Sequence, residues 1–217
     1  MNSRALPFGH GIWPTPLSLA WRFLCVTVVV LWAAHGLERR IIAPLIPALR
    51  ATIGVLDDSF LILDARVAEA GPAATLSFSA NLAHPVVVAG QTLHPFGSDG
   101  VPPGYAQVDC TLGGVLEYSC VLLILALGWP ARGARELLVR LALCAPLLLL
   151  LVLIDVPSTV IAELWNSFEQ DANVHRVDNW MIWSRFLMGG GGFALALAFA
   201  AAALAVAARL DAPHSVA

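Results

Sequence analysis

Long apolar runs alternate with shorter polar stretches along this chain, and four of the runs are long enough to cross a membrane. A helix rises about 1.5 Å per residue, so crossing about 30 Å of hydrocarbon takes roughly 20 residues. The pattern predicts four transmembrane helices, over residues 17–37, 112–129, 137–156 and 186–208. The remaining parts are tails at 1–16 and 209–217, a turn at 130–136, and two longer polar segments at 38–111 and 157–185.

The segment between the first two predicted helices changes its period from helical to strand-like. Residues 41–56 place their apolar side chains on one helical face, which predicts an interfacial helix. Residues 75–82 alternate apolar and polar side chains, as a half-buried strand does, and residues 60–67 are the expected partner. Val86–Val88 and Gln91–Leu93 flank a tight turn and predict a hairpin. We therefore expect a small extracytoplasmic β domain between helices 1 and 2.

The segment between helices 3 and 4 is predicted to lie along the membrane surface. Asp155 suits a helix N-cap and Pro157 suits a first turn, so an interfacial helix is expected to begin here. Tryptophan favours the membrane–water boundary, and this region carries Trp165, Trp180 and Trp183. An amphipathic helix on the membrane is the favoured interpretation. The alternative is a polar platform that faces a partner or a substrate.

Composition supports a membrane protein and restricts its partners. The chain of 217 residues is 59% hydrophobic and 12% charged, whereas soluble domains carry about 25% charged residues. Its net charge of −3 argues against a nucleic-acid partner. Membrane lipid and other membrane proteins are the expected contacts.

Arginine placement predicts the orientation. Arg132 and Arg135 lie in the short turn between helices 2 and 3, and Arg140 follows closely. A short, arginine-rich turn favours the cytoplasmic side, which puts both termini in the cytoplasm. Arg39 and Arg40 follow directly after the first helix and favour the opposite orientation.

A candidate polar cluster lies at the outer ends of the helices. Arg185 enters the last helix and needs a counter-charge, because an unpaired charge at this depth is costly. Asp155, Glu163 and Glu117 are acids at similar depth. A structural ion pair is the favoured interpretation, and a site that holds a carboxylate is the alternative.

The last helix carries a small residue at every fourth position, at Gly190, Ala194, Ala198 and Ala202. Small residues let helix backbones approach closely in lipid, so this is a candidate helix-packing face, towards this chain or a partner. A hinge at the glycines is the alternative.

The sequence contains no recognisable catalytic or metal-binding motif. The six histidines are scattered without metal-ligand spacing, and the four cysteines form no CxxC pair. We expect no catalytic residues, no metal and no cofactor.

Three stretches resemble a known family: residues 155–166 (DVPSTVIAELWN), 183–192 (WSRFLMGGGG) and 111–116 (TLGGVL). They resemble the small membrane proteins that accompany exosortases, in particular the exosortase H-associated membrane protein. Exosortases are transpeptidase-like enzymes of the bacterial inner membrane that process proteins with a C-terminal sorting helix. The resemblance implies an accessory partner in that membrane, not the enzyme, and it implies no catalytic residues.

The sequence as a whole predicts a non-catalytic accessory or assembly subunit of an exosortase-like protein-processing or sorting system. Its expected partner is a larger membrane protein, and a strand edge of the β domain offers a pairing site for an extended peptide segment. One alternative is a membrane enzyme with an outer-surface site around Asp155, Glu163 and Arg185. The other is a small transporter subunit, which the scarcity of polar residues at mid-depth disfavours.

Overall fold

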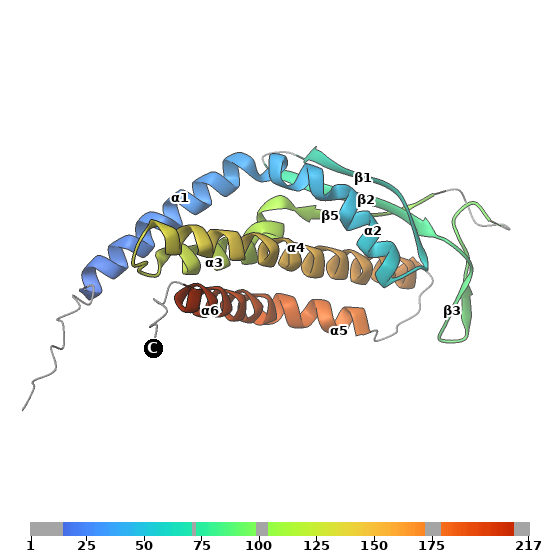
Figure 1. Cartoon of the computed structure of the whole chain (residues 1–217). Helices are drawn as coiled ribbons and strands as arrows, with labels where there is room; N and C mark the ends of the chain where they lie inside the picture. Colours follow the sequence, from blue (N-terminus) through green and yellow to red (C-terminus); the bar gives the residue numbers. More distant parts are fainter. Residues whose placement is uncertain (1–14, 71–72, 99–103, 172–178, 211–217) are drawn as a thin grey trace, which may run out of the picture.

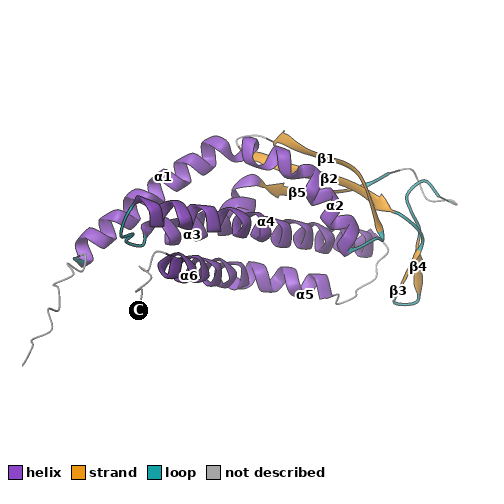
Figure 2. Ribbon diagram, in the orientation of Figure 1, coloured by secondary structure: helices purple, strands orange, loops and turns teal. Residues whose placement is uncertain are grey.

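The computed structural model describes residues 15–70, 73–98, 104–171 and 179–210, and it shows a bundle of long helices with a small β-sheet at one end (Figure 1). The strands all gather at that end, beside the last turns of the longest helix (Figure 2). In chain order the elements are α1 (Pro16–Ile42), α2 (Ile46–Leu56), β1 (Phe60–Ala70), β2 (Ala73–Leu82), β3 (Val86–Val88), β4 (Gln91–Leu93), β5 (Ala106–Thr111), α3 (Leu112–Gly128), α4 (Ala134–Asp171), α5 (Asn179–Phe186) and α6 (Gly192–Leu210).

Three helical stretches of the described chain are long and apolar enough to cross a membrane. They are Pro16–Leu56, Ala134–Gln170 and Asn179–Leu210. Helix α3 completes the bundle and is apolar, but it is shorter than these three stretches, with 17 residues. It packs against α1, α4 and α6 and so joins the bundle together. The chain is therefore a helical membrane protein with a small β domain.

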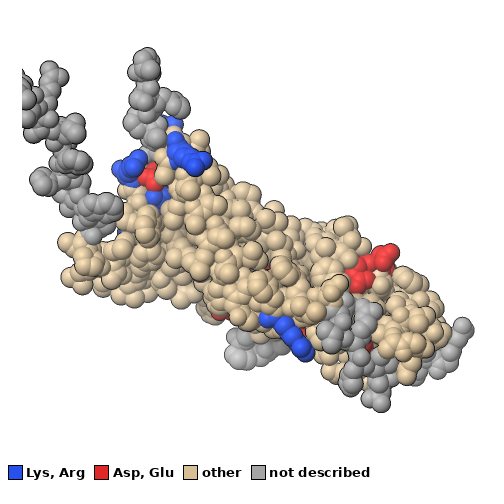
Figure 3. All heavy atoms as spheres, turned by 90° about the horizontal axis from the view of Figure 1, so that it is seen from below, with Lys and Arg blue, Asp and Glu red and all other residues tan. Residues whose placement is uncertain are grey.

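The outside of the bundle suits lipid. Trp21, Val28 and Trp32 on α1 are exposed although they are large and apolar. Arginines gather at the end of the molecule where α1 begins and α6 ends, and the flank beyond them carries few charges (Figure 3). A broad, uncharged apolar flank is stable in hydrocarbon and unfavourable in water.

The main sheet has three antiparallel strands in the order β1-β2-β5. Phe60 pairs with Leu82 and Ala70 with Ala73, with a register shift between Ile62 and Asp64. The predicted pairing of residues 60–67 with 75–82 is confirmed. So is the hairpin of β3 and β4. Strand β5 was not predicted, and it makes one edge of the sheet.

One apolar core joins the sheet to α2 and to the C-terminal half of α4, hereafter its outer half. Leu76 and Phe78 of β2 are fully buried, together with Leu49 of α2 and Leu164 of α4. The helix predicted over residues 41–56 therefore exists, after a 3-10 turn at Ala43–Leu45, but its apolar face packs on protein. The expectation that it rests on lipid is wrong for that face, because α4 and β1 already cover it.

Helix α4 is one continuous helix of 38 residues, about 57 Å long. The prediction of a separate interfacial helix beginning near Asp155 is wrong. Asp155 lies in the middle of α4, and Pro157 lies inside the helix. The helix continues past this proline because its outer half is buried against α2, β5 and the aromatic rings of Phe60 and Phe96.

The last helix is kinked where α5 meets α6. A π-helical turn at Leu187–Gly191 joins them, and Gly190 has a φ of 112°. Beyond the kink, α6 buries a row of small residues in the bundle: Gly192, Ala196, Ala200, Ala203 and Ala207. The predicted packing face lies on another side of the helix, and its members Ala194, Ala198 and Ala202 are exposed.

A buried ion pair closes the turn between α3 and α4. Arg140 donates to the carbonyl oxygens of Ala126, Trp129 and Pro130 and to the carboxylate of Glu136. Both charged side chains are almost fully buried. The last carbonyls of a helix have no partner within it, so the arginine stabilises the end of α3 as well as the turn.

Candidate functional site

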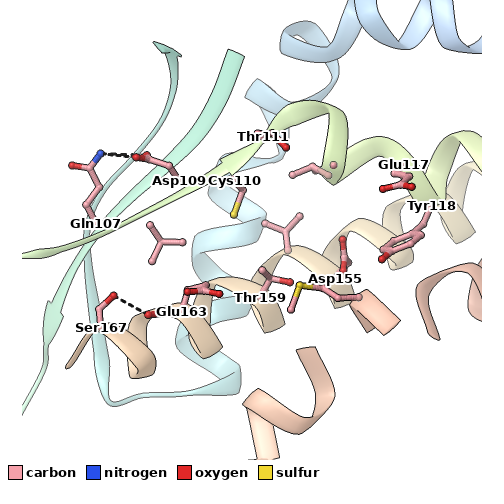
Figure 4. A pocket seen from close by; sticks show the side chains of 15 residues that line it. Gln107, Asp109, Cys110, Thr111, Glu117, Tyr118, Asp155, Thr159, Glu163 and Ser167 are labelled. Carbon is pink, nitrogen blue, oxygen red and sulfur yellow. Dashed lines mark hydrogen bonds between the residues drawn. The ribbon is translucent and has the colours of Figure 1, made fainter. Parts of the chain in front are cut away.

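A cavity of about 440 Å³ opens between β5, the start of α3 and the outer half of α4 (Figure 4). Five consecutive residues of β5 line one wall, from Gln107 to Thr111. The facing wall is α4, Tyr118 lies at one end, and Met188 also lines the cavity (Figure 4). The remaining lining residues are Gly114, Val115, Glu117, Asp155, Val156, Thr159, Glu163 and Ser167.

Four carboxylates line the cavity, and no arginine is among the described lining residues. They are Asp109 of β5, Glu117 of α3, and Asp155 and Glu163 of α4. Asp109 accepts hydrogen bonds from the Gln107 side-chain amide at 3.1 and 3.2 Å. In the described part of the chain, the carboxylates of the other three have neither a hydrogen bond nor an ion pair. The cavity therefore carries negative charge that no described residue compensates.

The acids of α4 belong to a polar stripe along the helix. Asp155, Thr159, Glu163 and Ser167 follow one another at intervals of four residues, which places them on one face. The opposite face of the same helix is buried in the core, with Ile161, Leu164 and Phe168. The amphipathic pattern of the outer half of α4 thus fixes the direction in which its acids point.

Three of the four residues of the predicted polar cluster meet in this cavity, and Arg185 does not. Arg185 is exposed and lines a separate, smaller cavity of about 120 Å³ that also touches Glu163. Among the described residues it forms no ion pair. The expected structural ion pair of Arg185 is therefore not formed, because α5 turns this side chain outwards.

Cys110 is the one thiol in the cavity wall. Burial raises its pKa, and the nearby carboxylates of Asp155, Glu163 and Asp109 raise it further, to about 11. A thiol with this pKa is almost entirely protonated near neutral pH, and the thiolate is the nucleophilic form. Cys110 is therefore a weak nucleophile in this environment.

Tyr118 connects the cavity to the kink of the last helix. Its hydroxyl donates a hydrogen bond of 3.0 Å to the carbonyl oxygen of Leu187, in the π-helical turn. Its ring meets the ring of Phe193 edge-on, with centroids 5.1 Å apart. One end of the cavity is therefore held by contacts between α3 and the last helix.

Sequence reasoning found Glu117, Asp155 and Glu163 but missed the rest of the wall. Two signals were present. One is the four-residue interval that adds Thr159 and Ser167 to the stripe. The other is the alternation of Ala106, Val108 and Cys110 with polar residues, which is typical of a strand.

Comparison with protein-family models, with curated proteins and with solved structures finds no match to this chain. Among the described residues, no group of three or more His, Cys, Asp or Glu side chains is placed to hold a metal ion. The cavity itself is characterised by its shape, by carboxylates without a partner among the described residues, and by its position beside a strand edge.

Proposed function

We propose that this protein is a non-catalytic accessory subunit of a membrane system that processes or sorts proteins, and that its acidic cavity docks a cationic segment of the partner. The observation that carries the proposal is the group of carboxylates on Glu117, Asp155 and Glu163, none of which pairs with a described residue. Like charges held in one cavity repel, so a bound cation relieves a cost that the free protein bears. Charge complementarity of this kind selects partners and orients them.

The proposed topology has four membrane-spanning helices, with both termini in the cytoplasm. The start of α1, the turn between α3 and α4, and the end of α6 lie at the same end of the bundle, which supports this arrangement (Figure 1). The arginines gathered at that end support its assignment to the cytoplasmic side (Figure 3). The acidic cavity and the β domain then face outwards.

An exosortase-like system in the bacterial inner membrane is the proposed setting. It rests on the resemblance of residues 111–116, 155–166 and 183–192 to exosortase-associated membrane proteins. These stretches form the start of α3, the polar stripe of α4 and the kink of the last helix. All three therefore contribute to the cavity or to its end, which links the resemblance to the proposed site.

A binding role suits the cavity better than a catalytic one. Cys110 is disfavoured as a nucleophile by its raised pKa. No histidine is among the described lining residues. Arg185 of the alternative enzyme site lies in the neighbouring cavity.

Purification from the native membrane tests the proposal. The wild type is compared with the triple variant Glu117→Gln, Asp155→Asn, Glu163→Gln. Asp58→Asn is the matched control, because Asp58 is an exposed acid outside the cavity. We expect a membrane partner to copurify in stoichiometric amount with the wild type and the control, and to be lost from the triple variant. A wild type that purifies alone, or a partner that stays with the triple variant, would overturn the proposal.

A further inference from the structure

The edge of the main sheet that borders the cavity pairs with no other strand of the described residues. In the described chain β5 bonds to β2 alone, through the register that runs from Thr75–Thr111 to Ala80–Ala106. The backbone groups on its other side have no described backbone partner. An open strand edge is a template on which another extended segment can pair.

The cavity runs along this edge of β5, so residues from both faces of the strand line it. Successive strand residues point to opposite faces, yet all five residues from Gln107 to Thr111 line the cavity. Five strand residues extend over about 13 Å. The polar stripe on α4, from Asp155 to Ser167, runs for about 18 Å. The space beside the edge is therefore elongated, with a strand on one side and a polar helix face on the other (Figure 4).

We infer that an extended, arginine- or lysine-rich segment of a membrane partner binds in this cavity as a fourth strand, paired to the free edge of β5. This inference rests on the proposed docking function and specifies how the segment is held. Backbone pairing to β5 supplies hydrogen bonds that do not depend on sequence, and the side-chain surroundings supply the selection.

The positions of the acids define which segment fits. Asp109 lies on the opposite side of β5 from Cys110, because the two are neighbours in the strand. The Cys110 side chain points from β5 towards α4, where Asp155 and Glu163 lie (Figure 4). Side chains of an added strand also alternate between these two sides. Consecutive basic residues therefore each meet a carboxylate, whereas a segment with acids at these positions is repelled.

Backbone methylation of a peptide separates strand pairing from simple charge attraction. The probe is a short capped peptide of arginine and threonine, measured against the full chain in nanodiscs of zwitterionic lipid, with empty nanodiscs as the blank. Two further peptides carry N-methyl groups at the odd or at the even positions. Each removes the N–H donors along one edge of the extended peptide and leaves its charge unchanged. A strand that pairs along one edge loses its hydrogen bonds in one of the two peptides only.

We expect the unmodified peptide to bind the wild type and the Asp58→Asn control, and to bind the Glu117→Gln, Asp155→Asn, Glu163→Gln variant much more weakly. We expect one methylated peptide to bind about tenfold more weakly than the other, which corresponds to the loss of about two backbone hydrogen bonds. Binding should also protect Cys110 from a thiol reagent.

The two proposals fail in different ways. Binding that depends on the acids but is equal for both methylated peptides would overturn strand addition and leave cationic docking intact. Peptide binding that is the same for the wild type and the triple variant would overturn the docking function itself, and with it the inference.

Discussion

The indole N–H of Trp165 donates a hydrogen bond of 2.8 Å to the carboxylate of Asp57, a residue 108 positions earlier in the chain. Asp57 lies between α2 and β1, and its other carboxylate oxygen accepts from the backbone N–H of Ser59. The same indole ring meets Phe60 edge-on, at 4.9 Å between centroids. These contacts hold the outer half of α4, and with it one wall of the cavity, against the β domain.

Replacement of Trp165 by Phe should loosen this attachment. The ring keeps most of its apolar contacts but loses the donor to a charged acceptor, so we expect a loss of about 2 kcal/mol in the free energy of unfolding. The measurement is thermal unfolding of the detergent-purified protein. Asp58→Asn, which changes an exposed neighbour of Asp57, should leave the midpoint unchanged. An unchanged midpoint in Trp165→Phe would mean that the outer half of α4 is held by the apolar core alone.

The buried pair of Glu136 and Arg140 should be critical for the α3–α4 turn. Arg140→Leu leaves the Glu136 carboxylate buried without its cation and frees carbonyl oxygens at the end of α3. We expect destabilisation of about 3–5 kcal/mol, seen as a large drop in the thermal midpoint or in yield. Arg135→Leu removes an exposed arginine from the same turn and should have little effect. Equal stability of the two variants would contradict a structural role for the pair.

Alanine substitutions at the three glycines of the kink should have clearly different effects on stability. Gly190 has a positive φ that strains any other residue, so Gly190→Ala should cost about 1–2 kcal/mol. A Cβ on Gly192 would overlap the ring of Tyr118, so Gly192→Ala should displace that ring and disturb the end of the cavity. Gly189→Ala is the control, since nothing lies within 4 Å of its Cβ position. A ranking by thermal midpoint that placed Gly189→Ala lowest would argue against this geometry.

The two faces of α6 should respond differently to a larger side chain. Ala196 is fully buried, so Ala196→Leu overpacks the bundle and should destabilise the isolated protein by about 1–3 kcal/mol. Ala198 is exposed, so Ala198→Leu should leave that stability unchanged. Copurification then tests the exposed face separately. If Ala198→Leu keeps every membrane partner, the row of Ala194, Ala198 and Ala202 faces lipid and not protein.

Alkylation of Cys110 should show the charge of the cavity directly. With a pKa of about 11, about one thiol in a thousand is ionised at pH 8, so the rate should rise about tenfold per pH unit up to pH 10. The experiment uses a chain in which Cys25, Cys120 and Cys144 are replaced by alanine. Asp155→Asn removes the carboxylate that raises this pKa most after burial, so the curve should move to lower pH. A curve that does not move would place Asp155 too far from the thiol to act on it.

The β domain was largely predictable because its strands follow local rules. Alternation in residues 75–82 and the turn at Ala89 and Gly90 define their pairings without help from the rest of the chain. The path of α4 was not predictable in the same way. Asp155 and Pro157 are good signals for a helix start, but packing against α2 and β5 carries the helix through them. Tertiary contacts overrode local preference, as they often do.

The candidate site was predicted in part for a related reason. Glu117, Asp155 and Glu163 lie towards the same end of the bundle and line one cavity, and that general placement follows from position in the sequence. Whether Arg185 faces these acids depends on how α5 is rotated about its axis. No local sequence pattern specifies that rotation. Asp109 could be assigned to the site only together with strand β5, which was not predicted.

In the proposed topology, the unbroken length of α4 makes it a spacer between the bilayer and the proposed docking site. About 30 Å of such a helix would lie in hydrocarbon, counted from Ala134 at the inner boundary. Asp155 is about 32 Å from the start of α4 at Ala134, and Ser167 is about 50 Å from it. In that topology the cavity would begin where the hydrocarbon ends. A membrane partner would then need no linker to reach the cavity, because residues directly flanking its own membrane helix would lie at the same height. Inserting residues between such a helix and its basic segment would carry the segment past the cavity, so under the proposed docking function α4 would select partners by distance as well as by charge.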